Sequence, residues 1–126
     1  MSTRSILVVD DSPSNLRLFT YLLALPGYEV VTAACAEEAL RRLAQRAPDL
    51  IIMDLQLPDV DGLTLTRRLK DAPETKAIPI VAVTAFAIKG DEEKALAAGV
   101  DGYMSKPVDK RAFRALVARH LEPERA

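Results

Sequence analysis

Acidic, hydroxyl and basic side chains come at or just after the ends of four short apolar runs in this 126-residue chain. Asp10 and Asp11 follow the first run, Asp54 the third, Thr84 the fourth and Lys106 the fifth. Clustered carboxylates repel one another unless a cation offsets their charge. Oxygen ligands without histidine or cysteine favour a hard cation, so this set predicts a site for Mg²⁺ or Mn²⁺ rather than Zn²⁺.

The remaining groups are suited to holding a phosphate. Lys106 offers a point charge and Thr84 a hydroxyl donor for phosphate oxygens. Asp54 can act as a nucleophile, because carboxylates form aspartyl-phosphates. Taken one at a time these residues also have ordinary explanations, since Asp11 or Ser12 could simply cap the next helix. Their joint occurrence at the ends of the correct runs favours the phosphate site.

Strand-length apolar runs alternate with segments of helical period along the whole chain. The pattern predicts strands at residues 6–9, 28–32, 50–53, 78–83 and 102–104. It predicts helices from Pro13 to the stop at Pro26-Gly27, at 36–46, around Leu63–Leu69, at 89–98 and at 110–121. Five such units predict an α/β fold with one doubly wound, five-stranded parallel sheet. The carboxyl ends of its strands would bring the chemical groups together.

The composition is that of an ordinary globular domain, with 49% hydrophobic and 28% charged residues and a net charge of −1. A near-neutral balance gives no sign of nucleic-acid or membrane binding. The single cysteine, Cys35, excludes an internal disulfide bond. With no signal or membrane segment in view, we expect one cytoplasmic domain over residues 1–126, a core at about 5–121 and no output domain.

Four motifs, "VVDD", "MDLQLPDVDG", "VTA" and "SKP", carry a family resemblance. Over residues 6–121 the chain resembles the receiver domain of two-component response regulators, which implies a flavodoxin-like (βα)5 fold with strand order 2-1-3-4-5. The segments "MDLQLPDVDGL" and "VAVTAFAIKGDEEKALAAG" look like those of stand-alone, DivK-type cell-cycle regulators. Such a protein is a signalling domain whose own chemistry is limited to self-phosphorylation and autodephosphorylation.

The resemblance also implies roles for individual residues. Asp54 would be the phosphoacceptor, Thr84 and Tyr103 the switch residues, Lys106 the phosphate-binding ammonium and Pro107 a cis-proline. The Mg²⁺ ligands would be Asp10, Asp11, Asp54 and the backbone carbonyl of Gln56. Phe86, beside the site, would slow the loss of phosphate.

The same resemblance implies the partners. A sensor histidine kinase or a phosphotransfer protein would supply the phosphoryl group. A downstream protein would bind the last helices and fifth strand, including residues 87–89 and the helix from 91 to 98. The chain would be a monomer or a weak dimer. Cys35 and His120 receive no role.

Two alternatives remain open. The first is an interaction module of receiver fold that works without phosphorylation. The second is a Mg²⁺-dependent phosphatase-type hydrolase, which would need a second aspartate two residues after the nucleophile, where this chain has Gln56. A nucleotide- or flavin-binding domain is disfavoured, because the first strand leads into Asp10-Asp11-Ser12-Pro13 rather than a glycine-rich loop.

Overall fold

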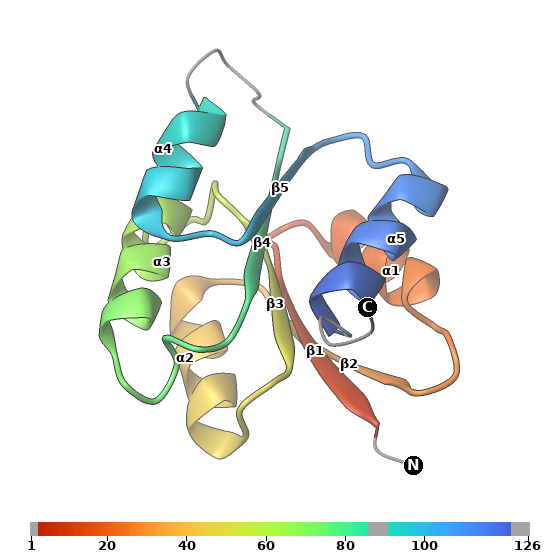
Figure 1. The fold of residues 1–126 in the computed structure, drawn as a ribbon, viewed down its shortest axis with the longest axis horizontal. Helices are drawn as coiled ribbons and strands as arrows, with labels where there is room; N and C mark the ends of the chain where they lie inside the picture. The colour runs from red at the N-terminus through yellow and green to blue at the C-terminus, as the bar shows by residue number, and fades with distance from the viewer. Residues whose placement is uncertain (1–2, 86–90, 122–126) are drawn as a thin grey trace.

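Five strands alternate with five helices in the computed structural model, which describes residues 3–85 and 91–121 (Figure 1). The strands are β1 (Arg4–Val9), β2 (Tyr28–Ala33), β3 (Leu50–Asp54), β4 (Ile80–Thr84) and β5 (Gly102–Ser105). The helices are α1 (Pro13–Leu22), α2 (Ala36–Gln45), α3 (Gly62–Asp71), α4 (Asp91–Ala98) and α5 (Lys110–Leu121). Within these ranges no helix is long and apolar enough to cross a membrane.

All four strand pairs are parallel and the sheet order is β2-β1-β3-β4-β5, which confirms the predicted topology. The register aligns the carboxyl ends of the strands, because Val9 pairs with Met53 and Asp54 pairs with Val83. On the next pair of strands, Thr84 lies opposite Ser105. The residues that follow β1 and β5 therefore emerge at the same edge of the sheet as Asp54 and Thr84.

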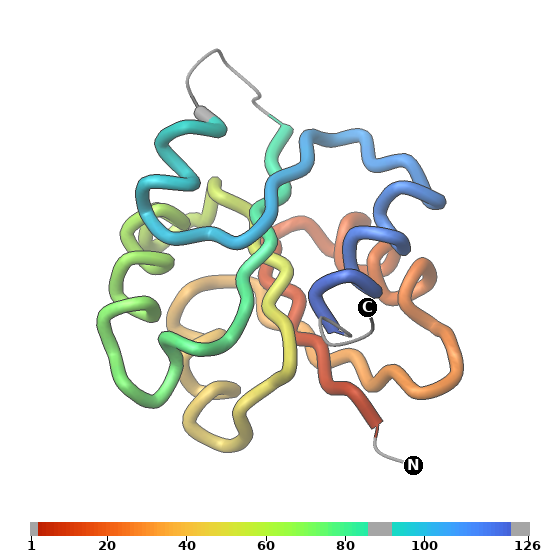
Figure 2. The backbone as a smooth tube through the Cα atoms, viewed as in Figure 1, coloured from red at the N-terminus to blue at the C-terminus, as the bar shows by residue number. Residues whose placement is uncertain are grey.

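Two helical layers cover the sheet, with α1 and α5 side by side on one face and α2, α3 and α4 on the other (Figures 1 and 2). Successive residues of β1 divide between the two cores because side chains alternate along a strand. Ile6 and Val8 pack with α1 and α5, whereas Leu7 and Val9 pack with the opposite layer. Both faces of the sheet are buried, which explains the wholly apolar runs in the sequence.

The start of α1 follows the sequence prediction. Ser12 is the N-cap residue, its hydroxyl accepts the Asn15 backbone N–H at 3.3 Å, and Pro13 is the first helical residue. Proline suits this position because the first N–H of a helix has no partner within the helix. The chain therefore turns from β1 directly into α1, and the three residues between them lie at the edge where the site is expected.

Several predicted boundaries differ from the structure. The fourth strand begins at Ile80 rather than residue 78, because the Ile78 N–H donates to the Thr75 carbonyl in a turn at 3.0 Å, and Pro79 has no N–H. The second helix ends at Gln45, one residue early. Strands β2, β3, β4 and β5 each end one residue later than predicted, and β1 begins at Arg4 rather than at residue 6. The predicted helix 89–98 is described only from Asp91, because residues 86–90 lie outside the described ranges.

Candidate functional site

The ammonium group of Lys106 joins two strand ends that are far apart in the sequence. Its Nζ atom lies 2.8 Å from Asp10 Oδ2 and 3.4 Å from Asp54 Oδ2. The backbone N–H of Lys106 donates to the carbonyl of Thr84 at 2.8 Å, which ties the segment after β5 to the end of β4. The structure thus brings together at one edge the Asp10, Asp54 and Lys106 side chains that the sequence predicted to converge.

Asp10 is almost completely buried, with 1% of its surface exposed. While Oδ2 faces Lys106, Oδ1 accepts the Ser12 backbone N–H at 2.9 Å and the Asn15 side-chain amide at 3.4 Å. A buried carboxylate is costly unless it is paired and hydrogen-bonded, and Asp10 is both. The Asn15 contact was not predicted from the sequence, although the expected start of α1 at Pro13 placed Asn15 in the first turn, within reach of Asp10.

Asp54 is also buried, and its surroundings act on its charge in opposite directions. Burial raises the pKa of the Asp54 carboxyl above its ordinary value, and nearby Asp10 adds to that rise. The Gln56 N–H, which donates to Asp54 Oδ1 at 3.1 Å, and the Lys106 ammonium lower the pKa. Burial is the largest effect, so the pKa stays raised.

Asp54→Asn is therefore expected to raise the free energy of unfolding near pH 7 when divalent metal is removed with EDTA. A folded-state pKa above the unfolded value of 3.8 means that ionised Asp54 opposes folding above its folded pKa. This penalty shrinks as the pH falls below the folded-state pKa, and it vanishes only below the unfolded-state pKa of 3.8, where the carboxyl is protonated in both states. Urea denaturation of the wild type and of Asp54→Asn, at pH 7 and near pH 4.5, measures the difference in their free energies of unfolding. A stability gain of Asp54→Asn that does not shrink at the lower pH would contradict the account.

Three carboxylates at this edge could hold a metal ion. One oxygen each from Asp10, Asp11 and Asp54 lies within 4.8 Å of the others, and Asp11 is exposed. Together with Lys106 these groups carry a formal surplus of two negative charges, which one divalent cation would balance. Oxygens bound at about 2.1 Å on an octahedral Mg²⁺ lie within about 4.2 Å of each other, close to the spacing observed here. The donor set therefore fits Mg²⁺ or Mn²⁺.

The other predicted residues lie around this cluster. Thr84 is buried at the end of β4, and Tyr103 on β5 is half-buried against the core shared with α2, α3 and α4. The Lys106-Pro107 peptide bond is cis, as the resemblance implied. Gln56 is exposed, and its backbone N–H is bound to Asp54. The predictions for Phe86 and for residues 87–89 fall outside the described residues.

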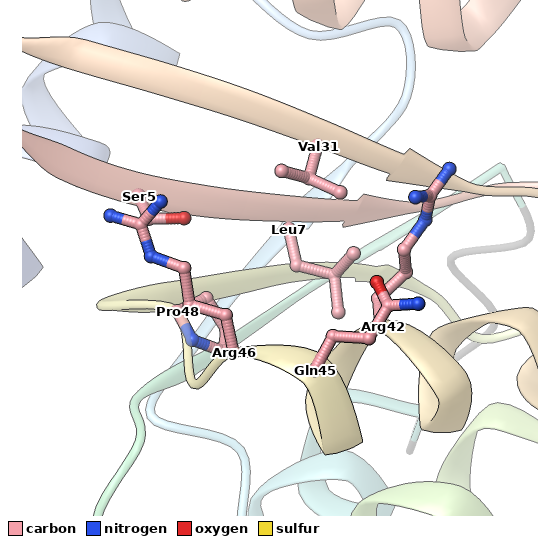
Figure 3. Close-up of a pocket in the computed structure, with 7 residues that line it drawn as sticks. All are labelled: Ser5, Leu7, Val31, Arg42, Gln45, Arg46 and Pro48. Atoms are coloured by element: carbon pink, nitrogen blue, oxygen red, sulfur yellow. The ribbon is translucent and has the colours of Figure 1, made fainter.

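A separate pocket of about 150 Å³ lies between the start of the sheet and α2, away from the carboxylates (Figure 3). Leu7 and Val31 lie in its centre, with Arg42 and Arg46 on either side. Both arginines already have acidic partners, since Arg46 lies 2.9 Å from Glu29 and Arg42 lies 3.6 Å from Glu38. Nothing in its lining connects this pocket to the chemistry at the opposite strand ends.

Comparison with known proteins yields one consistent family. The sequence pattern described as "Response regulator receiver domain" matches residues 6–118. The polar-differentiation response regulator DivK of Brucella ovis is 43% identical over 119 residues, which cover 94% of this chain and 97% of that protein.

Solved structures agree with the sequence match. A putative response regulator from Chloroflexus aurantiacus has a TM-score of 0.90 at 33% identity, covering 95% of this chain and 98% of its own. The receiver domain of a sensor histidine kinase from Pseudomonas aeruginosa has a TM-score of 0.85 at 32% identity, with the same coverage. That structure carries a magnesium ion coordinated in its active-site cleft.

Proposed function

Because this chain belongs to the response regulator receiver domain family, we propose that it accepts a phosphoryl group on Asp54 and signals through protein contacts that depend on this modification. The observation that carries the proposal is the bridge of Lys106 between buried Asp10 and buried Asp54, with a third carboxylate alongside. A lysine held against two carboxylates can stabilise negative charge on a group transferred to one of them.

The donor would be the phosphohistidine of a sensor histidine kinase or of a phosphotransfer protein. An Asp54 carboxylate oxygen forms the new bond to phosphorus as the phosphorus–nitrogen bond breaks, and the imidazole leaves with that electron pair. Such a transfer requires mainly positioning and charge stabilisation from the protein. The Gln56 N–H and the Lys106 ammonium each contact one of the two Asp54 oxygens. In this proposal Lys106 would also meet the arriving phosphoryl oxygens.

The cation is Mg²⁺ in this proposal, with Mn²⁺ as a substitute. Asp10, Asp11 and Asp54 would hold it, together with the backbone carbonyl of Gln56. When bound, the ion neutralises charge on the transferred phosphoryl oxygens. The oxygen-only donor set supports this assignment, as does the magnesium ion in the Pseudomonas aeruginosa relative.

Phosphorylation would change the surface through Thr84 and Tyr103. The phosphoryl group adds about −1.5 to −2 charge and new acceptor oxygens beside the end of β4. In the proposal the Thr84 hydroxyl bonds one of these oxygens and Tyr103 turns inward, which favours an active conformation already present at low population. The downstream protein would then bind the surface formed by α4, β5 and α5.

Binding of beryllofluoride, a mimic of a carboxylate-bound phosphoryl group, tests the proposal. We expect fluorine NMR signals of bound beryllofluoride that require Mg²⁺ and disappear in Asp54→Asn, because only a carboxylate at this position can coordinate beryllium. An absence of bound signals in the wild-type chain would favour the interaction module that works without phosphorylation. Steady turnover of a small phosphate ester would instead favour the hydrolase.

A further inference from the structure

Helix α2 begins without a cap from its own N-terminal residue. Cys35 occupies the N-cap position in an extended conformation, and its side chain makes no capping hydrogen bond. The first N–H groups of a helix have no partners within the helix and need acceptors from elsewhere. In α2 the Cys35 side chain does not provide such an acceptor.

The acceptor is Asp59, which lies 23 residues after Ala36 and 22 residues after Glu37 in the sequence. Its Oδ1 accepts the Ala36 N–H at 2.9 Å and its Oδ2 accepts the Glu37 N–H at 3.0 Å. Both oxygens of the Asp59 carboxylate thus accept backbone N–H groups at the start of α2. The side chain of an ordinary N-cap residue accepts such an N–H with a single oxygen. These two hydrogen bonds hold the pKa of the Asp59 carboxyl below its ordinary value.

Asp59 belongs to the loop that joins the phosphoacceptor strand β3 to α3. At the start of this loop the Gln56 N–H donates to Asp54 Oδ1 at 3.1 Å, and at its end the Gly62 N–H donates to the Leu55 carbonyl at 2.9 Å. The first bond ties the loop to the Asp54 side chain, and the second closes the loop onto its own first residue. The bonds to α2 are made from the middle of the loop and anchor it to a helix on the same face of the sheet.

We propose that Asp59 is a positioning residue of the phosphoacceptor site, which anchors loop 55–61 to the start of α2 and so fixes the Gln56 backbone against Asp54. The inference rests on the proposed function, because it assigns Gln56 to the same site. Gln56 offers Asp54 its N–H and would offer the cation its carbonyl. Releasing the loop from α2 lets the Gln56 peptide unit move and loosens both contacts. Asp59 itself touches neither the phosphoryl group nor the metal.

Amide hydrogen exchange on the metal-free chain tests the anchor directly. In Asp59→Ala we expect the Gln56 and Gly62 amides to exchange about tenfold faster than in the wild type, along with Ala36 and Glu37. The matched control is Glu37→Ala, which removes an exposed carboxylate from the same helix end but keeps its backbone N–H. Faster exchange at Ala36 and Glu37 alone would overturn the inference and leave Asp59 a helix cap only.

The second readout is the Mg²⁺ dissociation constant, measured by calorimetry on variants whose circular dichroism shows them to be folded. We expect Asp59→Ala to bind Mg²⁺ about three- to tenfold more weakly than Glu37→Ala, because the Gln56 carbonyl is no longer held. Asp59→Asn keeps one acceptor oxygen and should fall between them, which provides a test if the alanine variant does not fold. Equal affinities in all three variants would also overturn the inference. If the wild type binds no Mg²⁺, the proposed metal site fails, and the exchange experiment still decides the role of Asp59.

Discussion

Lys106→Met is expected to slow phosphorylation by acetyl phosphate about 100-fold or more at saturating Mg²⁺. Methionine has a similar length but cannot stabilise the charge that gathers on the transferred oxygens. The same change leaves Asp10 and Asp54 without the ammonium that now lies 2.8 Å and 3.4 Å from them. The rate is measured as the growth of the phosphorylated species in intact-mass spectra, on protein whose circular dichroism shows it to be folded.

Lys110→Met is the matched control, because Lys110 is an exposed lysine at the first position of α5. It loses the same charge four residues away and should phosphorylate at the wild-type rate. A Lys106→Met rate within threefold of the control would mean that Lys106 is a structural partner of the two carboxylates. In that case the assignment of Lys106 to the phosphoryl group would be wrong.

Gly62→Ala is expected to lower the free energy of unfolding by about 2 kcal/mol and to impair the site. A Cβ atom at Gly62 would lie 2.6 Å from Leu55 Cα and 2.8 Å from the Asp54 carbonyl oxygen. Both are backbone atoms of Asp54 and of the residue after it, so no flexible side chain can move aside. Alanine favours a helix by up to about 1 kcal/mol over glycine, which is less than typical overpacking penalties of about 1–3 kcal/mol. The cost of the steric overlap therefore exceeds the gain in helix propensity, and Gly62→Ala is less stable than the wild type.

Urea denaturation of Gly62→Ala in EDTA measures this loss. Thr64→Ala is the control, since Thr64 is exposed two residues further along α3 and its replacement should change stability by no more than about 0.5 kcal/mol. A Gly62→Ala chain as stable as the wild type would show that the start of α3 can withdraw from β3 at little cost. The close packing of α3 on β3 would then not be needed for folding.

The arrangement of the site was predictable because it depends on sheet topology. Once the apolar runs are assigned to one parallel sheet, the residues after each strand must meet at its carboxyl edge. Asp10, Asp54 and Lys106 meet there as predicted. The helix signals at Ser12 and Pro13 were equally local, because capping depends on a few adjacent residues.

Contacts made by loops were not predictable in the same way. Asp59 caps α2 only because the loop after β3 follows a particular path, and no local pattern links Asp59 to Ala36. Arg114 is a similar case, since its Nε donates to the Leu22 carbonyl at the end of α1 across 92 residues. The start of β4 was misplaced because Ile78 reads as a strand residue, whereas its N–H is used in a turn.

The central claim is that Asp54 accepts a phosphoryl group with the help of Mg²⁺. The most direct measurement is the intact mass of the wild-type chain after incubation with acetyl phosphate, with Mg²⁺ and with EDTA, beside Asp54→Asn. We predict an increase of one phosphoryl group in the wild type with Mg²⁺ and none in the other two samples. The same increase in Asp54→Asn, or in the wild type with EDTA, would contradict the account.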